Sequence, residues 1–274
     1  MCPHTVSKEP LSHSEIVQHH ASAIVLWALV LACAVSVRSH EAVNGTDRST
    51  ATELARVLAC NDRAVGGPAL RRVNRVRYEL QIEEPGFTAV GHYAAERLGR
   101  AQIDVFVAEQ RVFSEGWDGH AGWQLPQGAT KPVATSPDGA AALRHGIEQP
   151  GHLWTLADMP QNGHAVELVG RDSIQGTNYY VVKLTLRDHF ESWYWLNPLS
   201  CLIERNRNFR AFHPDLDPKR KWTETLFDDY RVDQGILRSY LSRTVDMATG
   251  AVIGTTRILK LTNDVDALRD STAH

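Results

Sequence analysis

Residues 166–206 decide the fold class of this chain. From Leu168 onward they read LVGRDSIQGTNYYVVKLTLRDHFESWYWLNPLSCLIERN. Within 178–187 the side chains alternate between two faces, with Tyr180, Val182, Leu184 and Leu186 on one and Tyr179, Lys183, Thr185 and Arg187 on the other. A period of two is typical of a strand with one dry and one solvated face. Asn197-Pro198 ends a strand, because proline has no amide hydrogen and restricts the residue before it. The stretch therefore predicts three or four consecutive antiparallel strands.

The same alternation recurs along the chain on both sides of a segment rich in helix signals. Strands are predicted at 74–83, 87–96, 102–108, 111–117, 164–170, 178–187, 191–196, 202–209, 221–233, 236–245 and 252–262. Helices are predicted at 50–60, 68–73, 137–147 and 151–157. Ten or eleven strands with three or four helices indicate an α+β fold. A sheet that long must curl or close, and the helices are available to fill its concave side.

These elements divide the sequence into a leader and one large domain. Residues 43–50 are interpreted as a polar linker, and residues 43–274 as a single half-barrel domain. Residues 126–163 interrupt the strands with helical and Pro/Gly-rich sequence. They are interpreted as a helical lid inserted between the two strand series.

The amino-terminal segment predicts export. Residues 21–37 are apolar and carry no charge, which suits the core of a signal peptide and is short for a membrane span. Three interpretations of residues 1–42 stay open: cleavage after Ala34, acylation of Cys33 as in a lipoprotein, or retention as a membrane anchor. Each places the protein in the periplasm, either free or attached to a membrane.

Two cysteines, Cys60 and Cys201, remain beyond the leader. In an oxidising compartment they can form one disulfide, and the alternative is a pair of buried thiols. The sequence does not choose between the two.

Charge and motif content exclude several classes of function. The 29 Lys and Arg residues are balanced by 32 Asp and Glu residues, so the net charge of -3 gives no electrostatic footprint for nucleic acid. The sequence has no CxxC, HExxH, GxSxG or phosphate-binding loop pattern. We therefore expect no cofactor, no metal centre and no enzymatic activity.

A series of short motifs resembles the LolA/LolB-type outer-membrane lipoprotein-sorting proteins. In chain order they are Trp117-Asp118-Gly119, Gly122-Trp123, Leu168-Val169-Gly170-Arg171-Asp172, Gly176 with Tyr179-Tyr180, Tyr194-Trp195-Leu196-Asn197-Pro198, Leu202-Ile203-Glu204-Arg205 and the strand ending at 228–235. The resemblance covers most of 50–263. It implies an unclosed β-barrel whose apolar concave side is covered by helices and accepts acyl chains. It also implies a buried arginine that latches the lid, for which Arg97, Arg100 and Arg111 are the candidates.

Aromatic side chains are the candidates for lining such a cavity, since ligand pockets are mostly apolar and aromatic. The candidate lining residues are Trp117, Trp123, Tyr180, Trp193 and Trp195. The alternative for each is packing within the core. The sequence thus predicts a protein that binds a lipid or a lipoprotein acyl chain without covalent chemistry. The second hypothesis is an envelope sensor or scaffold that uses the same fold to bind a protein partner.

Overall fold

Two antiparallel meanders joined along one pair of strands form the single sheet of this protein. The computed structural model describes residues 40–265, with side chains from Ser49 onward. The predictions for the leader and for acylation of Cys33 lie outside these residues.

The strands follow the sheet order β6-β5-β4-β3-β2-β1-β13-β12-β11-β10-β9-β8-β7. Within each meander, neighbouring strands are consecutive in the sequence, and the pairing of β1 with β13 connects the two meanders. The strands of the first meander are β1(Val73–Glu84), β2(Phe87–Glu96), β3(Arg100–Val107), β4(Gln110–Trp117), β5(Gly122–Pro126) and β6(Val133–Ala134). Those of the second are β7(Ala165–Ile174), β8(Thr177–Thr185), β9(Glu191–Leu196), β10(Ile203–Arg210), β11(Lys221–Asp233), β12(Ile236–Asp246) and β13(Val252–Val265).

The described fold is mostly β, which corrects the expected α+β class, and its sheet has 13 strands rather than ten or eleven. The additional strands are β5 and β6. Strand β5 returns from a tight turn in which the Asp118 carboxylate accepts hydrogen bonds from the amides of His120 and Ala121, both at 2.8 Å. Strand β6 has only two residues and lies inside the segment expected to be helical. A strand this short has no alternation from which it could be predicted.

Three α-helices and one 3-10 helix accompany the sheet in the described residues: α1(His40–Ala64), α2(Gly67–Leu70), α3(Pro137–Glu148) and η1(Leu156–Asp158). Helix α1 begins at His40, so the expected linker at 43–50 is helical instead. Helix α3 is capped by Ser136, whose hydroxyl accepts from the amide of Gly139 at 3.0 Å. The predicted helix at 151–157 is largely irregular and ends in η1.

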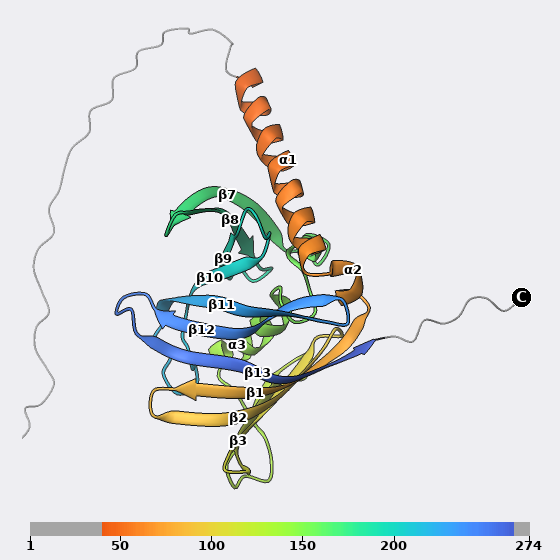
Figure 1. Ribbon diagram of the computed structural model, residues 1–274. Helices are drawn as coiled ribbons and strands as arrows, with labels where there is room; N and C mark the ends of the chain where they lie inside the picture. The colour runs from red at the N-terminus through yellow and green to blue at the C-terminus, as the bar shows by residue number, and fades with distance from the viewer. Residues whose placement is uncertain (1–39, 266–274) are drawn as a thin grey trace, which may run out of the picture. The chain divides into compact units, whose positions relative to one another are not determined.

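The apolar rows of the strands point to one side of the sheet, here called the inner face, where two core clusters form. The first cluster packs Val57 of α1 and Leu156 and Met159 of the η1 region against Val182 and Leu184 of β8. Helix α1 lies beside the β7–β9 end of the sheet (Figure 1).

The second core cluster belongs to the other part of the inner face. It packs Leu70 of α2 and Leu153 against Val76 and Leu80 of β1 and Ile236 of β12. Helix α3 also packs at this end, where it approaches β5 so closely that a Cβ on Gly122 would lie 2.8 Å from the Cα of Ala140.

A disulfide ties α1 to the turn between β9 and β10. Cys60 and Cys201 are joined with an S–S distance of 2.03 Å, and the Asn61 side chain donates to the carbonyl of Cys201 at 2.9 Å. Of the two alternatives left open by the sequence, the structure has the disulfide. Such bonds persist in oxidising compartments, which is consistent with export.

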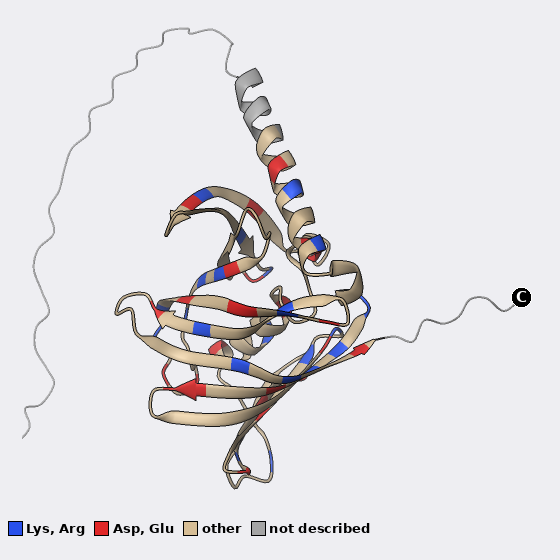
Figure 2. Ribbon diagram, viewed as in Figure 1, with Lys and Arg blue, Asp and Glu red and all other residues tan. Residues whose placement is uncertain are grey.

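Positive and negative side chains are interspersed along the strands, as Figure 2 shows. Several form cross-strand pairs, including Glu224 with Arg205 and Arg207 at 3.1 and 2.8 Å. In this view no strand carries a run of charges of one sign over its whole length.

Candidate ligand-binding site

A cavity of about 380 Å³ lies on the inner face between the two core clusters. It falls within the range of about 300–1,000 Å³ that is usual for small-molecule sites. Its walls come from the end of α1, from α2, from residues 150–155 and from β1, β2 and β9–β13. Its main apolar and aromatic lining residues are Val65, Leu70, Tyr78, Leu80, Tyr93, Trp154, Tyr194, Leu202, Ile203, Phe227, Tyr230, Ile236, Leu237, Tyr240 and Ile258. We call this space the inner cavity.

The strand period explains why the wall is apolar. Along β1 the side chains of Val76, Tyr78 and Leu80 are buried, whereas Arg77 points the other way and is exposed. Leu80 is paired in register with Ile258 of β13, which adds a second apolar side chain at the same level. Neighbouring strands in register therefore place their inward rows side by side and form a continuous apolar wall.

Tyrosine hydroxyls supply most of the polar groups in this wall. Tyr78 and Tyr93 stack with their ring centroids 5.8 Å apart, and His152 lies 5.3 and 5.1 Å from the two rings. Burial raises the pKa of Tyr78 to about 12 and also raises the pKa values of Tyr93 and Tyr194. These hydroxyls therefore stay protonated and uncharged at neutral pH.

His152 is also neutral in this environment. Burial, with a smaller contribution from the positive charge of Arg238, lowers its pKa to about 4. Its Nδ1 lies 3.2 Å from the Tyr78 hydroxyl oxygen. A neutral imidazole between two tyrosine rings keeps this side of the cavity uncharged.

Arg238 is the charged group of the cavity wall, and only 6 % of it is exposed. Its Nη1 donates to Oδ1 of Asn263 at 2.9 Å, and Asn263 in turn donates to Asp233 at 2.9 Å. Its Nη2 donates to the carbonyl of His152 at 2.9 Å. The guanidinium thereby connects β12 to the segment that covers the cavity.

That segment, residues 150–158, forms together with α2 what we call the cover. Arg97, at the end of β2, binds it most extensively. Its Nε donates to the carbonyl of Val73 at 3.0 Å, and its Nη2 donates to the carbonyls of Leu70 and Leu153 at 2.8 and 2.7 Å. The guanidinium also lies 4.2 Å from the ring of Trp154, and burial lowers its pKa. One side chain thus holds both parts of the cover to the sheet.

A second arginine fastens the cover to α1. Nε of Arg71 donates to Oδ1 of Asp158 at 2.6 Å, and the guanidinium also pairs with Asp62 of α1. The Thr155 hydroxyl donates to Asp62 at 2.9 Å. All these contacts are polar and exchangeable, in contrast to the disulfide on the same helix.

Three solved structures are similar to this chain. One is a LolA superfamily protein from Nitrosomonas europaea, at 12% identity and a TM-score of 0.53, covering 76% of this chain and 92% of that one. Another is a DUF1329 family protein from Desulfovibrio piger, at 14% identity and a TM-score of 0.52, covering 77% and 94%. A third, from Vibrio parahaemolyticus, is assigned as an outer membrane lipoprotein-sorting protein domain, at 8% identity and a TM-score of 0.50, covering 76% and 94%.

The chain has the LolA fold. At these identities the likeness concerns the fold alone, and it agrees with the resemblance that the sequence motifs predicted. No protein-family model and no curated protein sequence matches the chain.

Within this LolA fold, the three arginine candidates occupy different environments. Arg97 binds the carbonyl of Val73 at the start of β1 and those of Leu70 and Leu153 in the cover, as described above. Arg111 donates to the carbonyl of Leu125 at 3.0 Å and to the Ser114 hydroxyl at 3.3 Å. Arg100 is exposed on the face opposite the cavity. Of the three, only Arg97 contacts the cover.

The five aromatic residues predicted to line a cavity lie elsewhere in the LolA fold, outside the lining of the inner cavity. Tyr180 is on the inner face but belongs to the first core cluster under α1. Its hydroxyl accepts hydrogen bonds from Arg56 and, at 2.7 Å, from Arg171. Whether it contacts a ligand stays a prediction.

Trp193 and Trp195 point away from the inner face, because β9 pairs Trp193 with Lys183 and Trp195 with Val181. The Trp195 indole donates to Asp172 at 2.9 Å and is covered by Arg207 at 4.2 Å. Their neighbours Tyr194 and Leu196 occupy the inner positions instead. The face of a strand depends on register, which the tryptophans themselves do not reveal.

Trp117 and Trp123 flank the turn between β4 and β5 and line a second hollow, on the outer side of the sheet. Sequence reasoning missed the residues that do line the inner cavity, notably Tyr93, Phe227 and Ile258. The available signal was the inward row of the strand at 74–83, which contains Tyr78 and Leu80. It identified a dry face but not the space in front of it.

Neither a membrane-spanning helix nor a metal-binding cluster is found in the part of the chain that the structure describes. No helix among residues 40–265 is both long and apolar enough to span a bilayer. Within the same residues no group of three or more His, Cys, Asp or Glu side chains is arranged to hold a metal ion.

Proposed function

We propose that this protein is an exported, non-enzymatic carrier that binds an apolar ligand, such as a lipid or a lipoprotein acyl chain, in the inner cavity. The observation that carries the proposal is a cavity of about 380 Å³ walled by apolar and tyrosyl side chains beneath a separately held cover. Burial of each methylene group would contribute ~0.8 kcal/mol to binding. The lipoprotein-sorting assignment of a structure with the same fold supports the ligand class.

The polar groups of the cavity suit the end of such a ligand rather than its chain. The Arg238 guanidinium and the neutral hydroxyls of Tyr78 and Tyr194 are donors in an otherwise apolar wall. Nε of Arg238 and the hydroxyl of Tyr194 are buried and have no hydrogen-bond partner among the described residues. An ester or carboxylate oxygen would reach these donors once the neighbouring side chains move, and would then supply the missing acceptor.

Entry of a chain would require the cover to move, and Arg97 is the proposed latch. Its hydrogen bonds reach α2 through Leu70 and the 150–158 segment through Leu153. Breaking this set of contacts would loosen both parts of the cover together, and the hydrogen bonds of Arg71 and Arg238 and the packing of Leu70 and Leu153 would have to give way as well. Residues 126–163 would then act as the lid insertion that the sequence predicts.

The location completes the proposal. The disulfide between Cys60 and Cys201 supports an oxidising compartment, and the apolar residues 21–37 support export. We infer that the protein is periplasmic. It is either free in the periplasm or attached to a membrane through Cys33 or through the leader.

A matched pair of substitutions on β13 tests the site. Ile258 lines the inner cavity, whereas its neighbour Leu259 is 49 % exposed and does not line it. A dansyl-labelled undecanoic acid would report binding to purified full-length protein by fluorescence. Ile258→Trp should fill the cavity and abolish saturable binding, whereas Leu259→Trp should leave the affinity unchanged. Equal affinities of the two variants would contradict the proposal.

Extraction of purified protein followed by mass spectrometry provides a second readout. Co-purified lipid that is lost in Ile258→Trp would identify the natural ligand class. An empty cavity together with a stably co-purifying envelope protein would instead favour the sensor or scaffold hypothesis.

A further inference from the structure

The outer face of the sheet carries a larger hollow, of about 800 Å³, over β13 and β1–β5. The strand register explains its shape. One row of residues crosses these strands side by side, namely Thr262, Arg77, Ala94, Gln102, Gly116 and Trp123. Ala94 and Gly116 are small, and Gln102 between them donates a hydrogen bond to Asp104 of the adjacent row at 2.9 Å, so the middle of this row is low. We call the hollow the outer trough.

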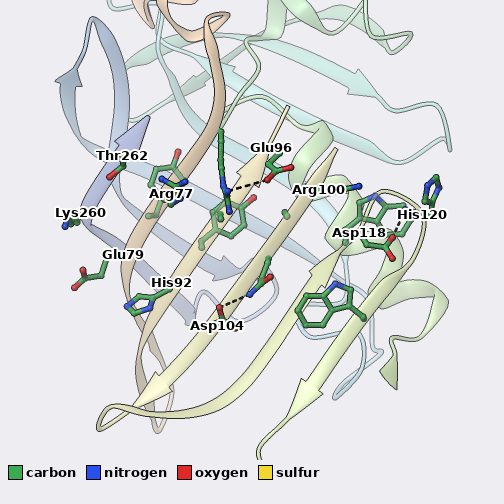
Figure 3. Close-up of a pocket in the computed structure, with 18 residues that line it drawn as sticks. Arg77, Glu79, His92, Glu96, Arg100, Asp104, Asp118, His120, Lys260 and Thr262 are labelled. Atoms are coloured by element: carbon green, nitrogen blue, oxygen red, sulfur yellow. Dashed lines mark hydrogen bonds and ion pairs between the residues drawn. The ribbon is translucent and has the colours of Figure 1, made fainter. Parts of the chain in front are cut away.

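Longer polar side chains on the two adjacent rows form its walls. One wall is the row Arg75, Glu96 and Arg100, and the other is the row Lys260, Glu79, His92 and Asp104. Figure 3 shows Glu96 and Arg100 along one side and Glu79, His92 and Asp104 along the other. With strands about 4.8 Å apart, five steps from β13 to β5 give the trough a length of about 24 Å.

A tryptophan ring closes one end of the floor. A Cβ placed on Gly116 would lie 2.8 Å from a ring atom of Trp123, so the indole rests directly on the glycine backbone. Any larger residue at position 116 would displace the ring. Trp117, Asp118 and His120, from the adjacent turn, also line this end.

The charges in the trough cancel. Four cations line it (Arg75, Arg77, Arg100 and Lys260), as do four acids (Glu79, Glu96, Asp104 and Asp118). A polyanion such as nucleic acid would meet as many carboxylates as cations, so the electrostatic attraction that drives such binding is missing. The alternation of signs instead offers closely spaced donors and acceptors.

Some of these polar groups also lack hydrogen-bond partners within the described residues. Nε of Arg75 is buried and has no hydrogen-bond partner among the described residues. The Arg75 guanidinium lies 3.6 Å from Glu96, which is too long for a hydrogen bond. Because no hydrogen bond joins the Arg75 and Glu96 side chains, a ligand hydroxyl can bind to either group without breaking one.

We propose that the outer trough binds an uncharged or zwitterionic oligosaccharide. Guanidinium, carboxylate, amide and imidazole groups pair with vicinal hydroxyls, and the exposed part of an indole packs against the apolar C–H face of a sugar ring. Both walls carry polar side chains, which suit the hydroxyl groups of a sugar better than the apolar side chains of a peptide. The length of the trough suits several linked rings better than one. This site is separate from the inner cavity and does not depend on the function proposed for it.

Calorimetric titration of the full-length protein with the tetramer of N-acetylglucosamine and with maltotetraose tests this inference. Saturable binding of at least one is expected. Trp123→Ala should weaken it about tenfold, the effect of losing ~1.4 kcal/mol of ring contact. Trp123→Phe, which keeps an aromatic platform, should recover most of the affinity. Trp222→Ala, an exposed tryptophan outside the trough, is the matched control and should change nothing.

An unchanged urea-unfolding midpoint verifies that Trp123→Ala still folds, and titration with the dansyl fatty acid separates this inference from the carrier function. No binding of either tetrasaccharide would overturn the inference. So would equal affinities for Trp123→Ala and Trp222→Ala. Binding only of an anionic heparin tetrasaccharide, with a strong salt dependence, would overturn it in favour of a polyanion site.

Discussion

The two halves of the inner face differ in how they are covered. Over β8 and β9, α1 and the η1 end of the cover fill the concave side with side chains such as Val57, Leu156 and Met159, which are at most 3 % exposed. Over β1, β2 and β11–β13, α2 and residues 150–155 of the cover leave the inner cavity. We call these the filled half and the hollow half.

The means of attachment differ in the same way. The filled half is fixed covalently, because Cys60 of α1 is bonded to Cys201. The cover of the hollow half is held by the packing of Leu70 and Leu153 and by arginine side chains, Arg97, Arg71 and Arg238, that bind carbonyls and carboxylates. A covalent bond fixes the first half permanently, whereas packing and polar contacts can open and re-form. The difference indicates that the filled half is a scaffold and that the hollow half holds the ligand-binding site.

The largest expected effect concerns the disulfide of the filled half. Replacing Cys60 and Cys201 by serine should lower the free energy of unfolding by about 5 kcal/mol in the chain-entropy limit, because the two residues are 141 positions apart. Urea denaturation of the double variant and of the oxidised wild type measures this. An unchanged midpoint would show that α1 is held by packing alone.

A pair of truncations compares the packing of the halves directly. Leu184→Ala in the filled half should cost about 3–4 kcal/mol, since Leu184 is fully buried and its removal leaves a void. Ile258→Ala in the hollow half should cost only about 1 kcal/mol, because its side chain already borders the inner cavity. Denaturant unfolding of both variants gives the two values, and similar costs would mean that the hollow half is packed as tightly as the filled one.

The hollow half should also respond to pH through His152. Its pKa is lowered to about 4 in the folded protein, so between about 4 and 6.5 the unfolded chain binds more protons. Stability should therefore rise with pH across this window, by at most about 3 kcal/mol. Unfolding measured from acid to neutral pH should show this slope for the wild type and a shallower one for His152→Gln. The exposed His120→Gln variant is the control, and a slope that persists in His152→Gln would contradict the assignment.

Substitution of the latch, Arg97, should have a small effect on stability and a clearer effect on the rate of ligand release. Arg97→Gln should cost about 1–2 kcal/mol, since it removes charged hydrogen bonds to carbonyls of the cover. The release of the dansyl fatty acid should be about tenfold faster, because the cover opens more often. Stopped-flow displacement measures the rate, with Arg100→Gln on the outer face as the matched control. Equal rates for the two variants would remove Arg97 from the role of latch.

Much of the fold could be predicted because alternation is a local signal. The rows at Tyr78 and Leu80 and at Val182 and Leu184 identified strands and their dry sides, and the chain has an open antiparallel sheet there. The candidate site could not be predicted in the same way. Trp193 and Trp195 are as apolar as any cavity lining, yet their pairing with Lys183 and Val181 directs them to the outer face.

By itself, the sequence determined the strand series, the dry face and the resemblance to the LolA fold, because each follows from the order and period of neighbouring residues. The tertiary structure alone decided that Cys60 meets Cys201, that Arg97 reaches the carbonyl of Leu153, and that a hollow remains beside Ile258. These three features join segments far apart in the chain. They depend on strand register and on how completely the helices fill the curve of the sheet, and local patterns of residues do not contain that information.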